Sequence, residues 1–114
     1  MKIKHLAARL EDCGVERRLL SDKVFAFGVL DEVVKKLGMT YIDKVYYKFK
    51  PEGLSVLYLI QQSHIAMHTW PEYSFIDVEI VTCKEDSDVE KGLEVIIKSY
   101  KPQKIEKCYW EYSI

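Results

Sequence analysis

The segment from Phe75 to Cys83 constrains the fold most, because apolar and polar residues alternate along it with a period of two. This is the pattern of a β-strand whose successive side chains point to opposite faces of a sheet. One face would carry Ile76, Val78 and Ile80, and the other would carry Phe75, Asp77, Glu79, Val81 and Cys83. The segment therefore predicts a sheet with one face packed on a core and one face uncovered.

Other stretches of the chain show strand or helix patterns, whereas residues 63–73 show no clear one. Strands are expected over 3–13, 41–49, 54–62, 74–82 and 103–114, with a turn at 51–53 that makes a hairpin. Helices are expected over 19–38 and 87–100, with N-caps at Ser21 or Asp22 and at Ser87 or Asp88, and with Gly38 at the end of the first helix. This order predicts one α+β domain spanning 1–114, a two-layer sandwich of a mainly antiparallel sheet with the helices on one face.

The uncovered face of this sheet has a consequence for assembly. If Ile76, Val78 and Ile80 face the helices, then Phe75 and Val81 expose apolar area on the other side of the strand. A second copy of the chain packed on that side would remove this area from water. We therefore expect a homodimer.

Charge and cysteine content exclude several classes of protein. The chain has 17 basic and 18 acidic residues, a net charge of −1, so it lacks the excess of Lys and Arg that nucleic-acid binding needs. No apolar run approaches the ~20 residues of a membrane span. Three cysteines are an odd number without zinc-type spacing, which favours free thiols in a reducing, cytoplasmic setting.

The stretch from Gln61 to Cys83 gathers the reactive side chains, and the residue types alone leave three interpretations open. His64 and His68 are four residues apart and would share one side of a strand or helix, but a metal would need Cys83 or His5 as a further ligand. Cys83 activated by His68 would make a nucleophile. An ordinary strand with a buried cysteine is the third interpretation.

The same stretch, "SHIAMHTWPEYSFIDVEIVTC", resembles the motif of the bacterial and archaeal S-adenosylmethionine decarboxylase proenzymes. In that family a serine–histidine pair, a histidine-threonine-tryptophan-proline-glutamate run and a threonine–cysteine ending follow in this order and spacing. The resemblance extends to "HLAARLEDC" near the start, to "KFKPEGLS" before the hairpin strand, and to the length of the chain. It therefore covers essentially the whole sequence.

The resemblance implies self-cleavage rather than an external cofactor or a metal. Ser63 would attack the carbonyl of Gln62 and, after elimination, leave a pyruvoyl group at the start of fragment 63–114 (the α chain), separated from fragment 1–62 (the β chain). His68 is the implied proton acceptor in this processing. Ser55 is the implied hydrogen-bond donor for the tetrahedral intermediate, with a hairpin-start serine bonded to backbone as the alternative. His64 would have a supporting or structural role.

For catalysis, the resemblance implies that the pyruvoyl group forms a Schiff base with S-adenosylmethionine and that Cys83 donates a proton after CO2 has left. Phe49 and Trp70 would attract the sulfonium cation and stack on the adenine, and Glu72 would bind ribose hydroxyls or balance the cation. Core packing of the two aromatics and an exposed turn at Glu72 are the alternatives. The product, S-adenosylmethioninamine, would supply aminopropyl groups for spermidine biosynthesis.

Two positions depart from the family pattern. Gln62 stands where glutamate is usual, and Lys84 follows the cysteine where glycine is common. Cleavage uses the backbone carbonyl of Gln62, so we expect it to proceed. The competing functions are an arginine decarboxylase of the same family and a non-catalytic α+β domain that binds a ligand.

Overall fold

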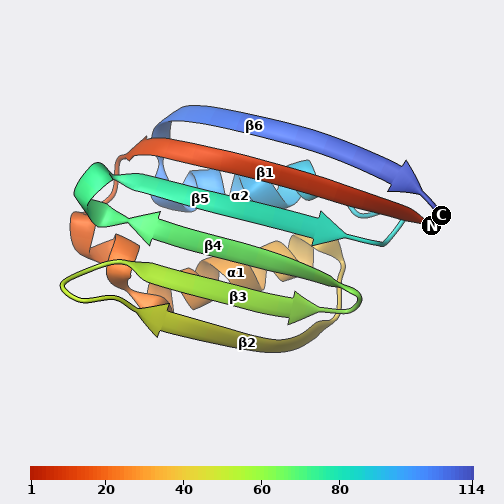
Figure 1. Cartoon of the computed structure of the whole chain (residues 1–114), viewed down its shortest axis with the longest axis horizontal. Helices are drawn as coiled ribbons and strands as arrows, with labels where there is room; N and C mark the ends of the chain where they lie inside the picture. The colour runs from red at the N-terminus through yellow and green to blue at the C-terminus, as the bar shows by residue number, and fades with distance from the viewer.

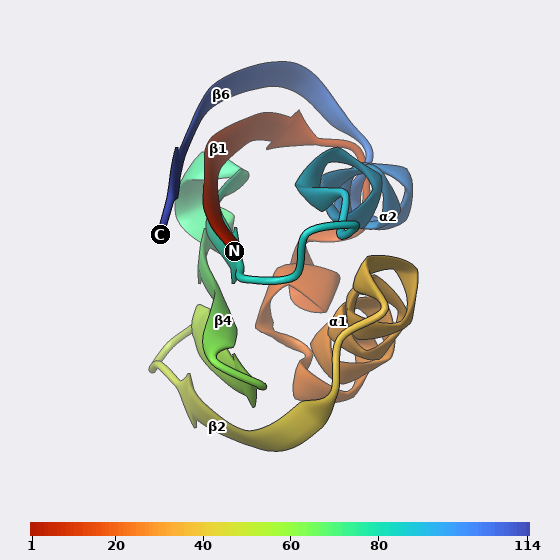
Figure 2. The same cartoon turned by 90° about the vertical axis from the view of Figure 1, so that its right-hand side faces the viewer.

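A computed structural model describes all 114 residues as one six-stranded sheet with two helices on one side. Figures 1 and 2 show α1 and α2 side by side against the same face, with the sheet curling around them. The strands follow the order β2-β3-β4-β5-β1-β6, and every neighbouring pair is antiparallel. The predicted α+β two-layer sandwich is confirmed. The elements are β1 (Lys2–Cys13), η1 (Arg17–Ser21), α1 (Lys23–Leu37), β2 (Tyr41–Lys48), β3 (Leu54–Ile60), β4 (Ser63–Trp70), η2 (Pro71–Tyr73), β5 (Phe75–Thr82), α2 (Val89–Tyr100) and β6 (Pro102–Ser113).

Strand β4 is the element that the sequence pattern did not reveal. It lies in the middle of the sheet, between β3 and β5. Its side chains do alternate, with Ser63, Ile65, Met67 and Thr69 buried. Two of these buried residues are polar, and Trp70 is exposed, so polarity does not follow burial along this strand. The pattern was hidden because hydroxyl groups occupy two core-facing positions.

The helix ends agree with the sequence and settle both pairs of candidate caps. The Asp22 carboxylate accepts hydrogen bonds from the first backbone N–H groups of α1, and Asp88 does the same for α2. Gly38 ends α1 with φ 65°, a left-handed conformation that glycine adopts without a steric cost. The predicted first helix began too early, because Arg17–Ser21 form a separate 3-10 turn.

The core lies between the helices and the face of the sheet that they cover. Ile76, Val78 and Ile80 of β5 are each at most 2% exposed, as the alternation predicted. Tyr58 of β3 is fully buried, and its hydroxyl donates to the Asp31 carboxylate at 2.7 Å. Burial, followed by this hydrogen bond, raises the pKa of Tyr58 far above its usual value.

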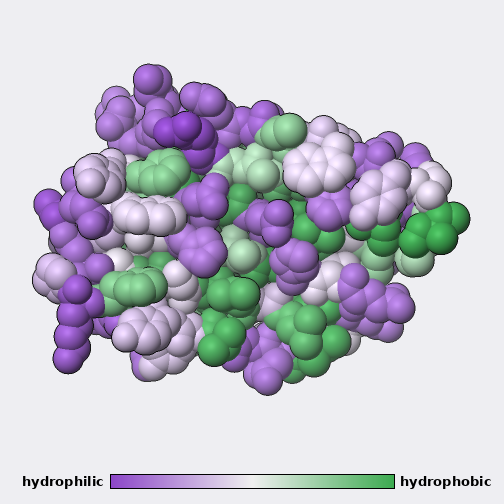
Figure 3. All heavy atoms as spheres, viewed as in Figure 1, coloured by the Kyte–Doolittle hydropathy of each residue, from purple (hydrophilic) through white to green (hydrophobic).

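The other face of the sheet has no layer on it, and we call it the open face. Figure 3 shows green apolar and purple polar side chains mixed across it. Val45, Leu57 and Leu59 are between 44% and 61% exposed. Val81 also lies on this side but is only 6% exposed, because His5 and His64 flank it on the neighbouring strands. The expectation that Val81 exposes apolar area was therefore wrong.

Neither helix combines the length and apolar character needed to cross a membrane.

Candidate active site

The turn between β3 and β4 contains the peptide bond predicted to be cut. Gln61 and Gln62 form this turn, and the Gln61 N–H donates to the carbonyl of Thr40 at 2.9 Å. Gln62 has φ 55°, a left-handed conformation that is uncommon for a residue with a side chain. The next residue, Ser63, is 5% exposed, and its Oγ makes no hydrogen bond within the chain. A buried hydroxyl without a partner is rare, because its desolvation is not compensated.

Cys83 lies beside this turn although it is 21 residues after Gln62 in the chain. It follows directly after β5, which pairs with β4, so the end of β5 meets the start of β4. The thiol Sγ lies 3.6 Å from the Gln61 carbonyl oxygen and 3.8 Å from Gln62 Oε1. These residues and Lys84 line a pocket of about 340 Å³. We call Gln61, Gln62, Ser63 and Cys83 the cleavage end.

His68 and Ser55 meet at the opposite end of the same hairpin. They are direct partners across β3 and β4, and His68 Nδ1 lies 2.6 Å from Ser55 Oγ. This hydrogen bond fixes the orientation of the imidazole and leaves Nε2 for another partner. The two residues that the resemblance assigned separately to processing are thus in direct cross-strand contact.

The predicted substrate residues line a pocket around this pair. Phe49, Trp70 and Glu72 form its wall together with Ser55 and His68, and its volume is about 420 Å³. Phe49 and Trp70 are 47% and 38% exposed, so neither is packed in the core. Each ring also contacts an aromatic neighbour, Phe49 with Tyr47 and Trp70 with Phe75. Both rings are therefore at the surface, in contrast to the core-packing alternative. We call this group the histidine end.

Hydrogen bonds that the sequence analysis missed hold the histidine end in place. Thr69 Oγ1 donates to the Leu20 carbonyl at 2.6 Å and accepts from the Leu54 N–H at 2.9 Å. Ser21 Oγ accepts from the Gly53 N–H at 2.8 Å. Of these residues, only Thr69 belongs to the motif from Ser63 to Cys83. A threonine on a core-facing strand position needs a hydrogen-bond partner, and this was the signal in the sequence.

An ion pair closes the rim of the same pocket. The Arg17 guanidinium binds the Glu52 carboxylate through two nitrogens. This hydrogen bonding from Arg17 lowers the pKa of Glu52. Glu52 therefore stays ionised at the edge of the pocket, where the sequence analysis had predicted only a turn.

The two ends lie far apart within one chain. Ser63 pairs with Ile60 and His68 pairs with Ser55, so five residues of β4 separate the two ends. At about 3.3 Å per residue this is roughly 16 Å. Figure 1 shows the β3–β4 turn at one end of the sheet and the β2–β3 loop at the other. The structure therefore brings Gln62, Ser63 and Cys83 together, and Ser55, His68, Phe49, Trp70 and Glu72 together, but it does not join the two groups.

His64 has its own partner on the open face. Its Nε2 lies 2.9 Å from Glu79 Oε1. No group of three or more His, Cys, Asp or Glu side chains is arranged to hold a metal ion. His64 and His68 are therefore partnered separately, by Glu79 and by Ser55, and do not converge on a common point.

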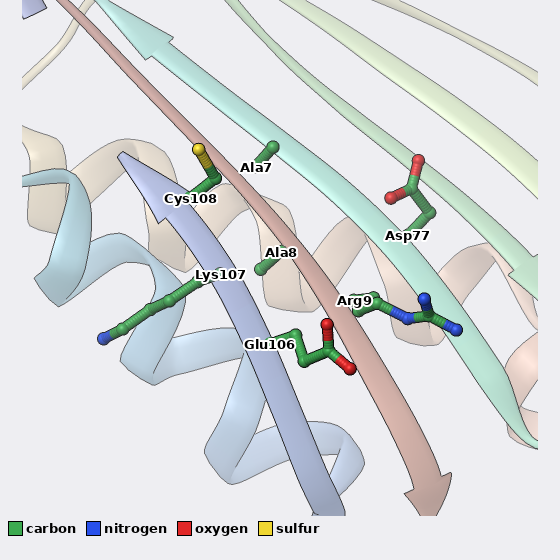
Figure 4. A pocket seen from close by; sticks show the side chains of 7 residues that line it. All are labelled: Ala7, Ala8, Arg9, Asp77, Glu106, Lys107 and Cys108. Carbon is green, nitrogen blue, oxygen red and sulfur yellow. The ribbon is translucent and has the colours of Figure 1, made fainter. Parts of the chain in front are cut away.

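A further hollow of about 240 Å³ lies on the open face, between β1, β5 and β6. Figure 4 shows Arg9, Asp77 and Glu106 around it, with Cys108 at one side. Arg9 is the cross-strand partner of both Asp77 and Glu106. None of the predicted catalytic or substrate residues lines this hollow.

A sheet covered on one face, with a buried serine at a turn, a thiol next to that turn and a serine–histidine pair, has the groups that a small α+β enzyme uses for nucleophilic attack and proton transfer. Residues 4–111 match the family model described as S-adenosylmethionine decarboxylase. The chain belongs to the S-adenosylmethionine decarboxylase family.

Named relatives and a solved structure agree with this assignment. The S-adenosylmethionine decarboxylase proenzyme of Archaeoglobus fulgidus is 35% identical over 100 residues, which cover 88% of each chain. The Pyrobaculum neutrophilum proenzyme is 30% identical over 112 residues, covering 97% of this chain and 89% of the relative. The crystal structure of the Aquifex aeolicus adenosylmethionine decarboxylase superposes with a TM-score of 0.86 at 30% identity, covering 98% of this chain and 91% of that one.

Proposed function

We propose that this chain cuts itself between Gln62 and Ser63 and then decarboxylates S-adenosylmethionine. The observation that carries the proposal is the buried, unpaired hydroxyl of Ser63, directly after a residue in a left-handed conformation. The Cys83 thiol contacts the same turn through Gln61 and Gln62. The names of the relatives, which describe proenzymes, support a processing step.

The cleavage follows from the position of the Ser63 hydroxyl. Its oxygen attacks the Gln62 carbonyl carbon and the peptide C–N bond breaks, so the amide becomes an ester. Removal of the Ser63 α-hydrogen then breaks the ester C–O bond and frees Gln62 as a carboxylate. Addition of water and loss of ammonia leave a ketone at residue 63. The reaction consumes no oxidant, and it yields fragments 1–62 and 63–114.

The residues around the turn fit a pyruvoyl group at this position, because Ser63 Oγ gives up no hydrogen bond when the group forms. Such a ketone accepts the electrons released when CO2 leaves an α-amino acid, as pyridoxal phosphate does. Cys83 then returns a proton to the α-carbon. Its thiol is partly exposed and lies next to the turn, within reach of a molecule bound at residue 63.

The pocket at the histidine end supports S-adenosylmethionine as the substrate. Phe49 and Trp70 offer exposed aromatic faces that attract a sulfonium by roughly 0.5–2 kcal/mol each and stack on an adenine. Glu72 lies on the same wall and can bind ribose hydroxyls or balance the cation. The product would serve as an aminopropyl donor for spermidine synthesis. The three free cysteines favour a reducing, cytoplasmic setting.

Two measurements test this function against its alternatives. Denaturing mass spectrometry of the purified protein should give two fragments, with residue 63 lacking its α-amine. A non-catalytic binding domain would remain a single chain of 13.4 kDa. Carboxyl-labelled S-adenosylmethionine should release CO2, and carboxyl-labelled arginine should not. Release of CO2 from arginine alone would show that the chain is an arginine decarboxylase of the same family.

We also propose that the working form is a homodimer joined through the open faces, because one chain holds its two groups of site residues roughly 16 Å apart. A twofold axis places the cleavage end of one copy against the histidine end of the other, and it does so twice. The exposed Val45, Leu57 and Leu59 become covered, and the charges of Arg9, Asp77 and Glu106 fix the register of the two sheets.

Complementation tests this arrangement directly. A Ser63→Ala chain cannot be cut, and a His68→Ala chain lacks the proton acceptor. In a mixed dimer, His68 of the Ser63→Ala chain should restore cleavage of the His68→Ala chain. If processing occurs within one chain, neither chain is cut in the mixture, and the dimeric site is excluded.

A further inference from the structure

The loop that carries Cys83 is held by a lysine from a distant part of the chain. Lys4 lies on β1, directly opposite Thr82 of β5. Its Nζ donates hydrogen bonds to the carbonyl oxygens of Glu85 at 2.7 Å and Ser87 at 2.6 Å. An ammonium group carries three donors and no acceptor, so it can bind two carbonyl groups at once. Lys4 therefore ties both sides of the loop to the sheet.

A second set of hydrogen bonds closes the same loop from inside. Ser87 is 4% exposed, and its Oγ lies 2.7 Å from both Thr82 Oγ1 and the Lys84 carbonyl oxygen. The Ser87 N–H also donates to the Lys84 carbonyl at 3.1 Å. Cys83 stands between Thr82, which is fixed in β5, and this closed turn.

Lys84 adds a link to the first helix. Its Nζ donates to the Gly38 carbonyl at 3.0 Å, at the end of α1. This bond is on the solvent-exposed side of the loop, whereas the bond from Lys4 to Ser87 is partly buried. The thiol itself makes two hydrogen bonds, to the Gln61 carbonyl at 3.6 Å and to Gln62 Oε1 at 3.8 Å. A thiol is a weak donor, so we expect the loop that begins at Cys83 to contribute more to its position than these two bonds do.

We infer that Lys4 is a positioning residue for the Cys83 thiol: by holding the loop that begins at Cys83, it determines which carbon receives the proton after CO2 has left. This inference rests on the proposed function. A proton delivered to the α-carbon of the substrate gives the amine product. A proton delivered instead to the carbon derived from Ser63 leads, after hydrolysis, to an aldehyde from the substrate and an alanine at residue 63, which ends turnover.

The first experiment measures this partition in Lys4→Met, with Lys2→Met as a matched control on the same strand and Lys4→Arg as the conservative variant. Lys2 is on the surface and pairs with Glu111 at 3.7 Å. All three should cut themselves as the unaltered chain does. Lys4→Met should form N-terminal alanine about tenfold more often per turnover, with kcat lowered and KM changed little. Lys4→Arg should lie between the two.

A second experiment needs no pyruvoyl group. In a Ser63→Ala background, hydrogen exchange at the Ser87 amide should be faster with Lys4→Met than with Lys2→Met. If the alanine fraction and the exchange rate both equal those of the Lys2→Met control, the inference is overturned. If the unaltered chain neither cuts itself nor releases CO2, the proposed function fails instead, and the inference falls with it. Should Lys4→Met not fold, the comparison of Lys4→Arg with Lys2→Met decides the question.

Discussion

The two ends of the β3–β4 hairpin are built in opposite ways. At the histidine end, Ser55 is bonded to His68 at 2.6 Å, and Thr69 satisfies both a carbonyl and an N–H group. At the cleavage end, the Ser63 hydroxyl has no partner and Gln62 is in a left-handed conformation. One end is held rigidly by hydrogen bonds, and the other keeps its reactive group free.

This difference matches the role that the proposed function gives to each end. A pocket that binds a substrate gains from side chains already fixed in place, because less entropy is lost on binding. A hydroxyl that must attack its own backbone cannot be tied to another acceptor. Its lack of a partner costs stability in the uncut chain, and the cost disappears when the hydroxyl is consumed.

Removing the free hydroxyl should have the largest effect. Ser63→Ala should abolish cleavage completely while leaving the fold intact, because the lost group makes no hydrogen bond. Mass spectrometry should find one chain, and thermal unfolding should show stability equal to or above that of a cleavage-deficient His68→Ala chain. Two fragments from Ser63→Ala would refute the assignment of this residue. Ser113→Ala, at the end of β6, is the matched control.

Removing the thiol should separate the two reactions at the cleavage end. Cys83→Ala should cut itself nearly as the unaltered chain does, because Sγ touches the turn only at 3.6 Å and beyond. Decarboxylation should fall by about 10²-fold or more, the scale of general acid catalysis. Fragment masses and CO2 release measure the two effects separately. Unchanged turnover would remove Cys83 from the reaction, and Cys108→Ala is the matched control.

Loosening the rigid end should lower the stability of the fold. Thr69→Val keeps the shape of the side chain but leaves the Leu20 carbonyl and the Leu54 N–H without a partner. We expect a loss of about 2 kcal/mol in the free energy of unfolding of the uncut Ser63→Ala chain. Denaturant titration measures this loss, with the exposed Thr40→Val as control. Equal stability of the two variants would show that the histidine end is not held by Thr69.

The smallest expected effect compares the partly exposed thiol at the cleavage end, Cys83, with a buried thiol in the core, Cys13. Burial raises the pKa of the Cys13 thiol to about 11, whereas Cys108 is exposed and Cys83 is partly exposed. At pH 8 iodoacetamide should leave Cys13 untouched in the native protein and modify it only after the protein is denatured. Because the folded pKa of Cys13 is raised, its contribution to stability is complete below pH 9 and declines as the pH rises toward 11. Early alkylation of Cys13 would contradict its burial.

The sequence predicted those parts of the fold in which polarity follows burial. The alternation of β5 gave the buried face correctly, and the side chains of Asp22 and Asp88 gave the helix starts. Strand β4 was missed because Ser63 and Thr69 face the core, and their polar side chains hide the pattern.

Which residues meet at each end of the hairpin could not be predicted, because this depends on the register and pairing of the strands. The contact between Ser55 and His68 follows from the register of β3 on β4, and the contact of Cys83 with Gln61 follows from the pairing of β4 with β5. The motif named these residues, but their roughly 16 Å separation into two groups appeared only in the structure.

The central place of β4 has a consequence for the folding of the mature molecule. If the chain is cut before Ser63, as proposed, β4 becomes the first strand of a separate polypeptide that stays paired with β3 on one side and with its own β5 on the other. Unfolding then releases two molecules instead of one, so the melting temperature of the cut form should depend on protein concentration, unlike that of an uncut monomer. Reassembly becomes a bimolecular encounter, and dilution opposes it. An uncut chain refolds by itself. The folding free energy of the two fragments also includes the entropy that they lose when they associate.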